Sequence, residues 1–303
     1  MNVNVRRYEH HTDYNRVGQF LIDTYQPGAR HDNWVQPRWE YMHYHPLFDE
    51  SLSTAFSNTG VSESNGSIVG VVHFEHHPGQ IFFQIHPEFT YLKAEMLEYA
   101  ETHLSVDAGG EKRKIEIWVN DFDIRFQSVI QERGYRLVER VKDSWSIFEI
   151  RDRFPAVKLP YGFRLQSLAD ENSLNKLHRV LHRGFDHPGE PPADGLAGRK
   201  RMQSAPNYRK DLNIVAVAPD GAYASYCGMW QDYVNRIAYV EPVCTDPDYR
   251  RMGLGTAVVI EGIRRCSKGG AMTAMVGSDQ PFYMSMGFKK LFGINLWTRE
   301  REI

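Results

Sequence analysis

The chain has 303 residues, of which 42% are hydrophobic and 24% charged, and its formal net charge is −2. These values predict a folded globular protein of about two domains, without the basic surface that binds nucleic acid or a membrane. The sequence contains no apolar leader core and no apolar run of about 18 residues, the length that spans a membrane. The three widely spaced cysteines are typical of free thiols in a reducing compartment, so we expect a cytoplasmic protein.

The two halves of the chain begin alike. A short strand is expected at 5–8 and again at 163–165, and each precedes a helix with apolar residues at helical spacing. Asp13 and Asp170 stand where a helix N-cap belongs, so we expect these helices to begin there. The repetition indicates one α/β pattern written twice.

The two halves also end alike. In each, a short helix stops at a glycine, Gly134 or Gly287, which is followed by an aromatic residue. Glycine suits the left-handed backbone position after a helix C-terminus. A proline-bearing stretch at 151–161 separates the two patterns, so we predict two domains, at 1–152 and 160–303.

The second half has the clearer pattern of elements. We expect its strands and its long helix, in chain order, at 213–218, 223–230, 237–244, 253–265 (the helix) and 271–276. Strands in a row, then one helix and one strand, indicate an α+β or mixed α/β fold. The Pro- and Gly-rich stretch 186–198 precedes these elements, and we interpret it as a functional loop.

The most informative segment is a glycine-bearing turn after the third of these strands. Arg250 and Arg251 precede Gly253 and Gly255, and a helix follows. Unpaired N–H groups at a helix N-terminus attract anions, and glycines let a pyrophosphate approach the backbone. The segment is not a P-loop, and Val258 replaces the third glycine of the dinucleotide fingerprint. A turn that merely connects strand and helix is the alternative.

Arg250, Gly253 and Gly255 fill the pattern Arg/Gln-x-x-Gly-x-Gly/Ala, so the segment resembles the acyl-CoA-binding motif of the GNAT acetyltransferase superfamily. The strand before the turn and the Tyr-x-x-x-Gly-Phe ending at 283–288 stand where that family has them. The resemblance covers the second half from Phe163 onward. The first half is similar to the family in layout only.

The resemblance implies two tandem domains, each an α+β (mixed α/β) fold with a central, mostly antiparallel, splayed sheet flanked by helices. It also implies acetyl-CoA as cosubstrate and no metal. The pyrophosphate would lie on the turn formed by Arg250, Arg251, Met252, Gly253, Leu254, Gly255 and Thr256. The pantetheine arm would pair with the main chain of Val243, Cys244 and Thr245.

Acetyl transfer from a thioester to an amine needs a base, a donor to the oxyanion and a proton for the thiolate. Glu241 lies two residues before Val243, so strand alternation predicts that both face the same way. By resemblance, Glu241 is the base or substrate anchor and Tyr283 the acid. A structural charge and a core aromatic are the respective alternatives. The backbone N–H of Val243 or Cys244 is the candidate oxyanion donor, and direct transfer needs no cysteine nucleophile.

The first half departs from the motif. Lys93 and Glu95 stand where the glycines should be, and Ile130 stands where the tyrosine would be. We therefore predict a degenerate copy without CoA, kept for packing or for shaping the acceptor site. His43 and His45 have the spacing of metal ligands in a strand, but no cysteine or paired carboxylate completes a set, so we expect solvated or hydrogen-bonded histidines.

Together these features predict an N-acetyltransferase that moves an acetyl group directly to a primary amine of a small molecule. Glu190 and Asp194, in the 186–198 loop, are weak candidates for binding that amine. The alternatives are a non-catalytic CoA- or partner-binding protein and a protein N-acetyltransferase. No nucleic-acid or membrane partner is expected, and a homodimer is compatible with the sequence.

Overall fold

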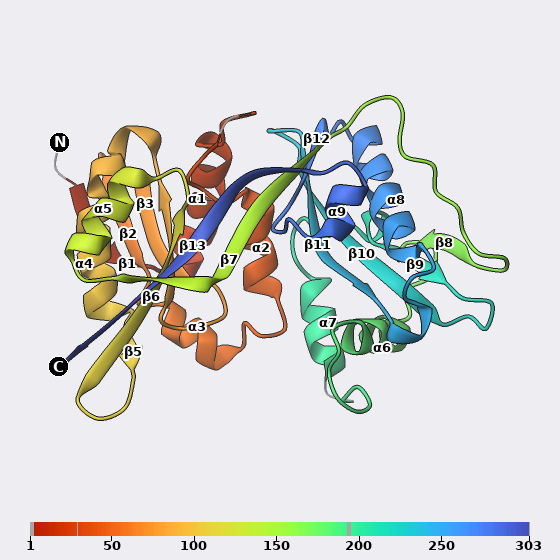
Figure 1. The fold of residues 1–303 in the computed structure, drawn as a ribbon, viewed down its shortest axis with the longest axis horizontal. Coiled ribbons are helices and arrows are strands. Elements are labelled where there is room, and N and C mark those ends of the chain that lie inside the picture. The colour runs from red at the N-terminus through yellow and green to blue at the C-terminus, as the bar shows by residue number, and fades with distance from the viewer. Residues whose placement is uncertain (1–2, 29, 193–194, 303) are drawn as a thin grey trace. The chain divides into compact units, whose positions relative to one another are not determined.

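The computed structural model describes residues 3–28, 30–192 and 195–302. The chain forms two compact units (Figure 1). The first unit comprises Met1–Met42, Leu47–Trp145 and Lys290–Ile303, and the second comprises His43–Pro46 and Ser146–Lys289. Each unit consists of a mostly antiparallel sheet with helices packed on it, so the predicted mixed α/β fold class is confirmed.

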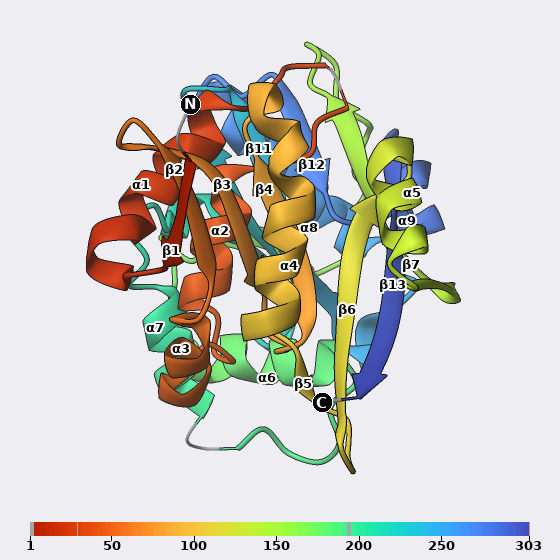
Figure 2. The ribbon, with the colours of Figure 1, turned by 90° about the vertical axis from the view of Figure 1, so that its left-hand side faces the viewer.

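The first unit is built on a sheet in the order β1-β2-β3-β4-β6-β13-β7, with the short β5 beside β6. Its elements are β1 (Val3–Arg7), α1 (His10–Asp23), α2 (Gln36–Tyr44), α3 (Glu50–Phe56), β2 (Gly60–Ser64), β3 (Ser67–Phe74), β4 (Gln80–Ile85), α4 (Lys93–His103), β5 (Val106–Asp107), β6 (Lys112–Asn120), α5 (Ile124–Glu132), β7 (Arg136–Glu149) and β13 (Lys289–Glu302). Helices α1 and α4 both contact β3, and Figure 2 shows α4 in front of β3 and β4. Because helices cover both faces, β3 is buried along almost its whole length.

The second unit has the order β12-β11-β10-β9-β8, and the last four residues of β7 pair with β12. Its elements are β8 (Arg164–Ser167), α6 (Leu174–Gly184), α7 (Leu196–Met202), β9 (Ile214–Val217), β10 (Tyr223–Asp232), β11 (Ile237–Thr245), α8 (Leu254–Lys268), β12 (Thr273–Val276) and α9 (Pro281–Ser285). Helix α8 packs on one face of this sheet and α6 on the other. The end of the expected 186–198 loop is the start of α7.

The C-terminal strand does not follow the expected domain division. The sequence predicts one domain over 160–303, but β13 belongs to the first unit. There it forms an antiparallel ladder of nine residue pairs with β6, from Ile294–Asn120 to Glu302–Lys112. The strand is therefore held by main-chain hydrogen bonds to the first half of the chain.

Both predicted N-caps are wrong, although both helices exist. Helix α6 is capped by the hydroxyl of Ser173, which accepts from the N–H of Lys176, while Asp170 accepts from Ser167 in the preceding turn. Helix α1 begins at His10, so Asp13 lies inside its first turn. The expected left-handed glycines after α5 and α9 are present, with φ of +85° at Gly134 and +104° at Gly287.

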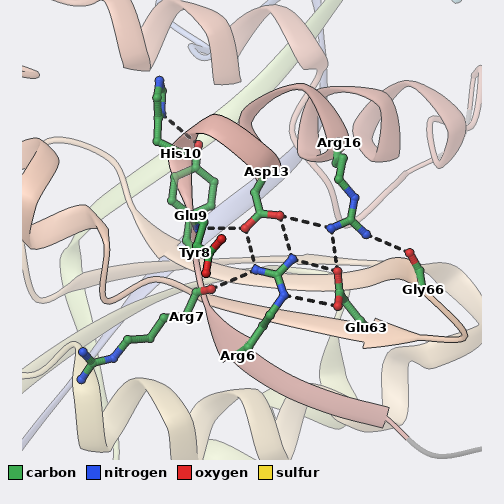
Figure 3. Close-up of polar contacts among 9 residues, drawn as sticks. All are labelled: Arg6, Arg7, Tyr8, Glu9, His10, Asp13, Arg16, Glu63 and Gly66. Carbon is green, nitrogen blue, oxygen red and sulfur yellow. Dashed lines mark hydrogen bonds and ion pairs between the residues drawn. The ribbon is translucent and has the colours of Figure 1, made fainter.

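Asp13 is instead the centre of a buried ion cluster (Figure 3). Its carboxylate is fully buried and receives two hydrogen bonds from the Arg6 guanidinium, at 2.6 and 2.7 Å, and one from the Glu9 backbone N–H. Arg6 also pairs with Glu63, and Arg16 contacts both carboxylates. Since a buried carboxylate is costly unless it is paired, this cluster fixes α1 to β1 and β2.

Two further properties concern the part of the chain that the structure describes. None of its helices is both long enough and apolar enough to cross a membrane. It also contains no group of three or more His, Cys, Asp or Glu side chains arranged to hold a metal ion. His43 and His45 lie at and just beyond the end of helix α2 and not in a strand.

Candidate active site

The sheet of the second unit opens between β11 and β12. These two strands are parallel and pair only at Ile237–Thr273, Ala238–Ala274 and Tyr239–Met275. Strand β11 then continues for six residues beside β10 alone, and β12 ends at Val276. The backbone of β11 after Tyr239 therefore has a strand neighbour on one side only.

A bulge changes the direction of the side chains where the opening begins. Val240 pairs with Met229 and Val243 pairs with Cys227, so Glu241 and Pro242 together oppose the single residue Gly228. Val240 and Val243 both pack into the core on the α8 side. The extra residue breaks the two-residue period between Val240 and Val243, so strand alternation does not determine which way Glu241 faces relative to Val243. Glu241 is half-buried.

Two residues of β10 hold this bulge, and the sequence reasoning missed both. The indole Nε1–H of Trp230 donates to the main-chain oxygen of Glu241 at 3.0 Å, and the Trp230 ring is buried against Tyr208. At Gly228, an added Cβ would lie 2.6 Å from that same oxygen. A glycine inside a strand pattern is itself a sign of a bulge or a close backbone approach.

Replacing Gly228 with alanine should lower the free energy of unfolding by about 1–3 kcal/mol, since the new methyl group must displace main chain. Urea denaturation of the purified protein measures this change. Gly277→Ala is the matched control, because a Cβ at Gly277 meets nothing within 4 Å. Equal stability of the two variants would show that the bulge tolerates a side chain.

The glycine turn has the geometry of an anion site. Gly253 is the N-cap of α8 with φ of +77°, a conformation that favours glycine, and no side chain caps the helix. The first-turn N–H groups of α8 are therefore left for another acceptor. Gly255 is buried, and a Cβ there would lie 3.1 Å from the Phe282 ring and 3.3 Å from the Thr245 hydroxyl. Leu254 anchors the helix in the core, while Thr256 is half-buried beside it.

The first arginine of the glycine turn, Arg250, forms hydrogen bonds with the end of α6. The Arg250 guanidinium donates to Asp186 at 2.8 Å and to the carbonyl oxygen of Gly184, at the end of α6. Nearby, Arg183 of α6 forms ion pairs with Asp246 and Asp248 of the β11–α8 connection. Arg250 is thus a residue that fixes the turn to α6. Arg251 and Met252 are exposed.

Tyr283 is a buried tyrosine within electrostatic range of Glu241. Tyr283 lies on α9, packs in the α8-side core and is only 9% exposed. Burial, and to a lesser extent the nearby Glu241 carboxylate, raises the pKa of Tyr283 well above its ordinary value. The phenol therefore stays protonated at neutral pH and can donate a hydrogen bond.

Cys244, like Tyr283, is held in its protonated form by burial. Its thiol is buried and donates to the main-chain oxygen of Val180 in α6, at 3.4 Å. Burial raises the pKa of Cys244 to about 12. A thiol that holds its proton is a poor nucleophile.

The candidate acceptor residues are less well placed. Glu190 is exposed in the stretch between α6 and α7. Asp194 lies outside the residues that the structure describes. In the first unit, α4 begins at Lys93 without a glycine turn, and Ile130 is fully buried in the core.

A sheet that opens at a parallel pair, with a glycine turn leading into the next helix, defines the GNAT class of acetyltransferase folds. Residues 176–288 match the acetyltransferase (GNAT) family. The second unit of this chain therefore carries a GNAT-family domain. No curated protein matches the sequence.

Solved structures match both units together. A GCN5-related N-acetyltransferase from Sphaerobacter thermophilus aligns with a TM-score of 0.63 and 14% identity, over 99% of this chain and 96% of that chain. A tandem GNAT protein from the clavulanic acid biosynthesis pathway aligns with a TM-score of 0.64 and 14% identity, over 99% and 98%. A GNAT-family acetyltransferase from Colwellia psychrerythraea aligns with a TM-score of 0.57 and 10% identity, over 97% of this chain and 99% of that chain. At these identities the similarity establishes the tandem GNAT fold and not the activity.

Proposed function

We propose that the second unit is an acetyl-CoA-dependent N-acetyltransferase that acts on a primary amine of a small molecule. The observation that carries this proposal is the opening of the sheet beside β11, together with the uncapped N-terminus of α8 that follows this strand. The effect of the Glu241 charge on the pKa of Tyr283 supports a shared role for these two residues. The first-turn N–H groups of α8 suit the pyrophosphate. The main chain of Val243, Cys244 and Thr245 suits the amides of pantetheine, because β11 has one unpaired side there.

The transfer is direct. Glu241, alone or through a water molecule, takes a proton from the ammonium form of the acceptor, and the amine nitrogen then attacks the thioester carbonyl carbon. The backbone N–H of Val243 or Cys244 donates to the resulting oxyanion. When the carbon–sulfur bond breaks, Tyr283 gives its proton to the departing sulfur. The amine nitrogen loses its second proton, which returns through water to the Tyr283 phenolate. A cytoplasmic location accords with three free, buried cysteines and with this cosubstrate.

Calorimetric titration with acetyl-CoA tests the cofactor site. We expect one site per chain in the wild type and at least about 100-fold weaker binding in Gly253→Glu, because the new carboxylate occupies the anion position. Gly66→Glu is the matched control, since Gly66 has φ of +79° and open space around it in the first unit. Equal loss in both variants, or no binding by the wild type, would rule out this site.

Acetyl transfer itself is tested by thiol release from acetyl-CoA in the presence of a panel of small amines and of peptides. Turnover with a small amine supports the proposal. Turnover with peptides alone would make the protein an N-acetyltransferase of proteins. Binding without any turnover would leave a non-catalytic CoA-binding protein.

A further inference from the structure

The first unit has an opening in its sheet like that of the second, but its own chain fills it. Strands β4 and β6 are parallel and pair only at Gln80–Glu116 and Ile81–Ile117. Beyond that point, the Asn33 side chain accepts from the N–H of Ile85 at 2.6 Å and donates to its carbonyl oxygen at 3.0 Å. Asn33 thus occupies both main-chain groups of Ile85, which stands four residues past the last parallel pair, as Val243 does in β11.

The same segment reaches the other side of the opening. The Asn120 amide, at the end of β6, donates to the main-chain oxygen of Asp32 at 3.4 Å and to its Oδ1 at 3.3 Å. Asp32 and Asn33 therefore bridge the ends of β4 and β6. Asn33 is only 4% exposed, so this is an internal part of the unit.

An open pocket of about 390 Å³ lies beside this segment, within the first unit. Its lining includes four charged and two apolar side chains, namely Asp32, Lys93, Asp123, Arg125, Phe126 and Val129. The formal charges of the four sum to zero. Such a pocket disfavours a polyanion such as a nucleotide, because two carboxylates would face its phosphates.

Three of the four charged groups are already paired with one another. The Lys93 ammonium is buried and pairs with Asp32 Oδ1 at 3.1 Å and with Asp123 Oδ2. The other oxygen of Asp123 caps α5 by accepting from the N–H of Phe126 at 3.1 Å. Lys93 and Asp123 therefore belong to the framework of the pocket.

One carboxylate oxygen of Asp32 and the Arg125 guanidinium remain. All hydrogen bonds and ion pairs of the Asp32 carboxylate use Oδ1, so within the described part of the chain Oδ2 has no partner. The Arg125 guanidinium likewise makes no ion pair or hydrogen bond with any described residue. The same pocket thus presents an acceptor for an ammonium group, a donor to a carboxylate, and an apolar wall at Phe126 and Val129.

We propose that this pocket binds a small zwitterion, a free α-amino acid with an apolar side chain. Its ammonium group donates to Asp32 Oδ2, its carboxylate accepts from Arg125, and its side chain packs on Phe126 and Val129. The site lies outside the acetyl-transfer site and is independent of the proposed function. It gives the first unit, which lacks the glycine turn, a ligand of its own.

Calorimetric titration of the full chain with L-leucine and L-phenylalanine tests this proposal. We expect saturable binding at one site per chain by at least one of them. L-leucine methyl ester lacks the carboxylate and N-acetyl-L-leucine lacks the ammonium group, so each should bind at least about tenfold more weakly than L-leucine. No saturable binding by either amino acid, or equal binding of the derivatives, would overturn the proposal.

Two variants locate the site. Arg125→Gln and Asp32→Asn should each weaken binding of the amino acid about tenfold or more, since each removes one charge partner. Arg136→Gln, an exposed arginine of the same unit, is the matched control and should bind as the wild type does. Undiminished binding by Arg125→Gln would place the ligand elsewhere. Gly253→Glu should bind the amino acid as the wild type does. The titrations with acetyl-CoA and with the amino acid therefore test the two proposed sites independently.

Discussion

Replacing Glu241 with glutamine should lower kcat for acetyl transfer by about 10²- to 10⁴-fold, the usual contribution of a general base. Glutamine keeps the size of the side chain but cannot accept the proton of the amine. The bulge should persist, because Trp230 and Gly228 hold the main chain of residue 241 and not its side chain. Steady-state rates of thiol release measure kcat, and calorimetry should give an unchanged Kd for acetyl-CoA.

The matched control is Glu261→Gln, since Glu261 is a half-buried glutamate of the same unit that pairs with Arg264 and Arg265 on α8. It should leave kcat within about twofold of the wild type, because surface ion pairs contribute little. If Glu241→Gln kept the wild-type kcat, Glu241 would be a structural charge in the strand. If both variants lost activity alike, the loss would reflect folding.

Replacing Asp13 with asparagine should lower the free energy of unfolding by about 3–5 kcal/mol, as is typical when one partner of a buried ion pair is removed. The neutral amide cannot balance Arg6, whose guanidinium would face Glu63 alone in a partly buried place. Urea denaturation at neutral pH measures the change. Asp23→Asn is the control on the same helix and should cost little, since the Asp23 carboxylate is exposed and accepts a hydrogen bond from Gln19.

The effect of this substitution should depend on pH. Burial alone would raise the pKa of Asp13, but the hydrogen bonds from Arg6 and from the Glu9 N–H prevail and lower it below its ordinary 3.8. A lowered folded-state pKa stabilises the fold above the unfolded value and loses that contribution as pH falls through the folded value. The difference between wild type and Asp13→Asn should therefore be full at neutral pH and shrink below about pH 4. A difference that is constant in acid would contradict the ion-pair interpretation.

The repeat and the glycine turn could be predicted from sequence because both depend on local chemistry. Gly134, Gly287 and Gly253 each take up the left-handed conformation for which glycine is suited. The bulge at Glu241 and Pro242 could not be predicted by counting along one strand, because it depends on the pairing with the neighbouring strand. Gly228 and Pro242 were the available signs of it.

The hydrogen-bond partner of Arg250 could not be predicted from the sequence. A motif indicates where the main chain binds a phosphate, but the guanidinium lies against Asp186, 64 residues away in sequence. The first residue of a helix is also hard to predict when a distant residue decides it. Asp13 has the chemistry of an N-cap, yet burial beside Arg6 places it one turn inside the helix.

Because of the paths of β7 and β13, neither half of the chain should fold when it is expressed without the other. Strand β7 starts in the first unit and pairs with β12 in the second, while β13 returns from the second unit to β6 in the first. A fragment that ends near residue 152 would lack β13 and leave the edge of β6 bare, which invites aggregation. The complementary fragment would carry an unpaired strand of its own. The two fragments should therefore be soluble and folded only when they are expressed together. They would then reassemble as a split protein through β7 and β13.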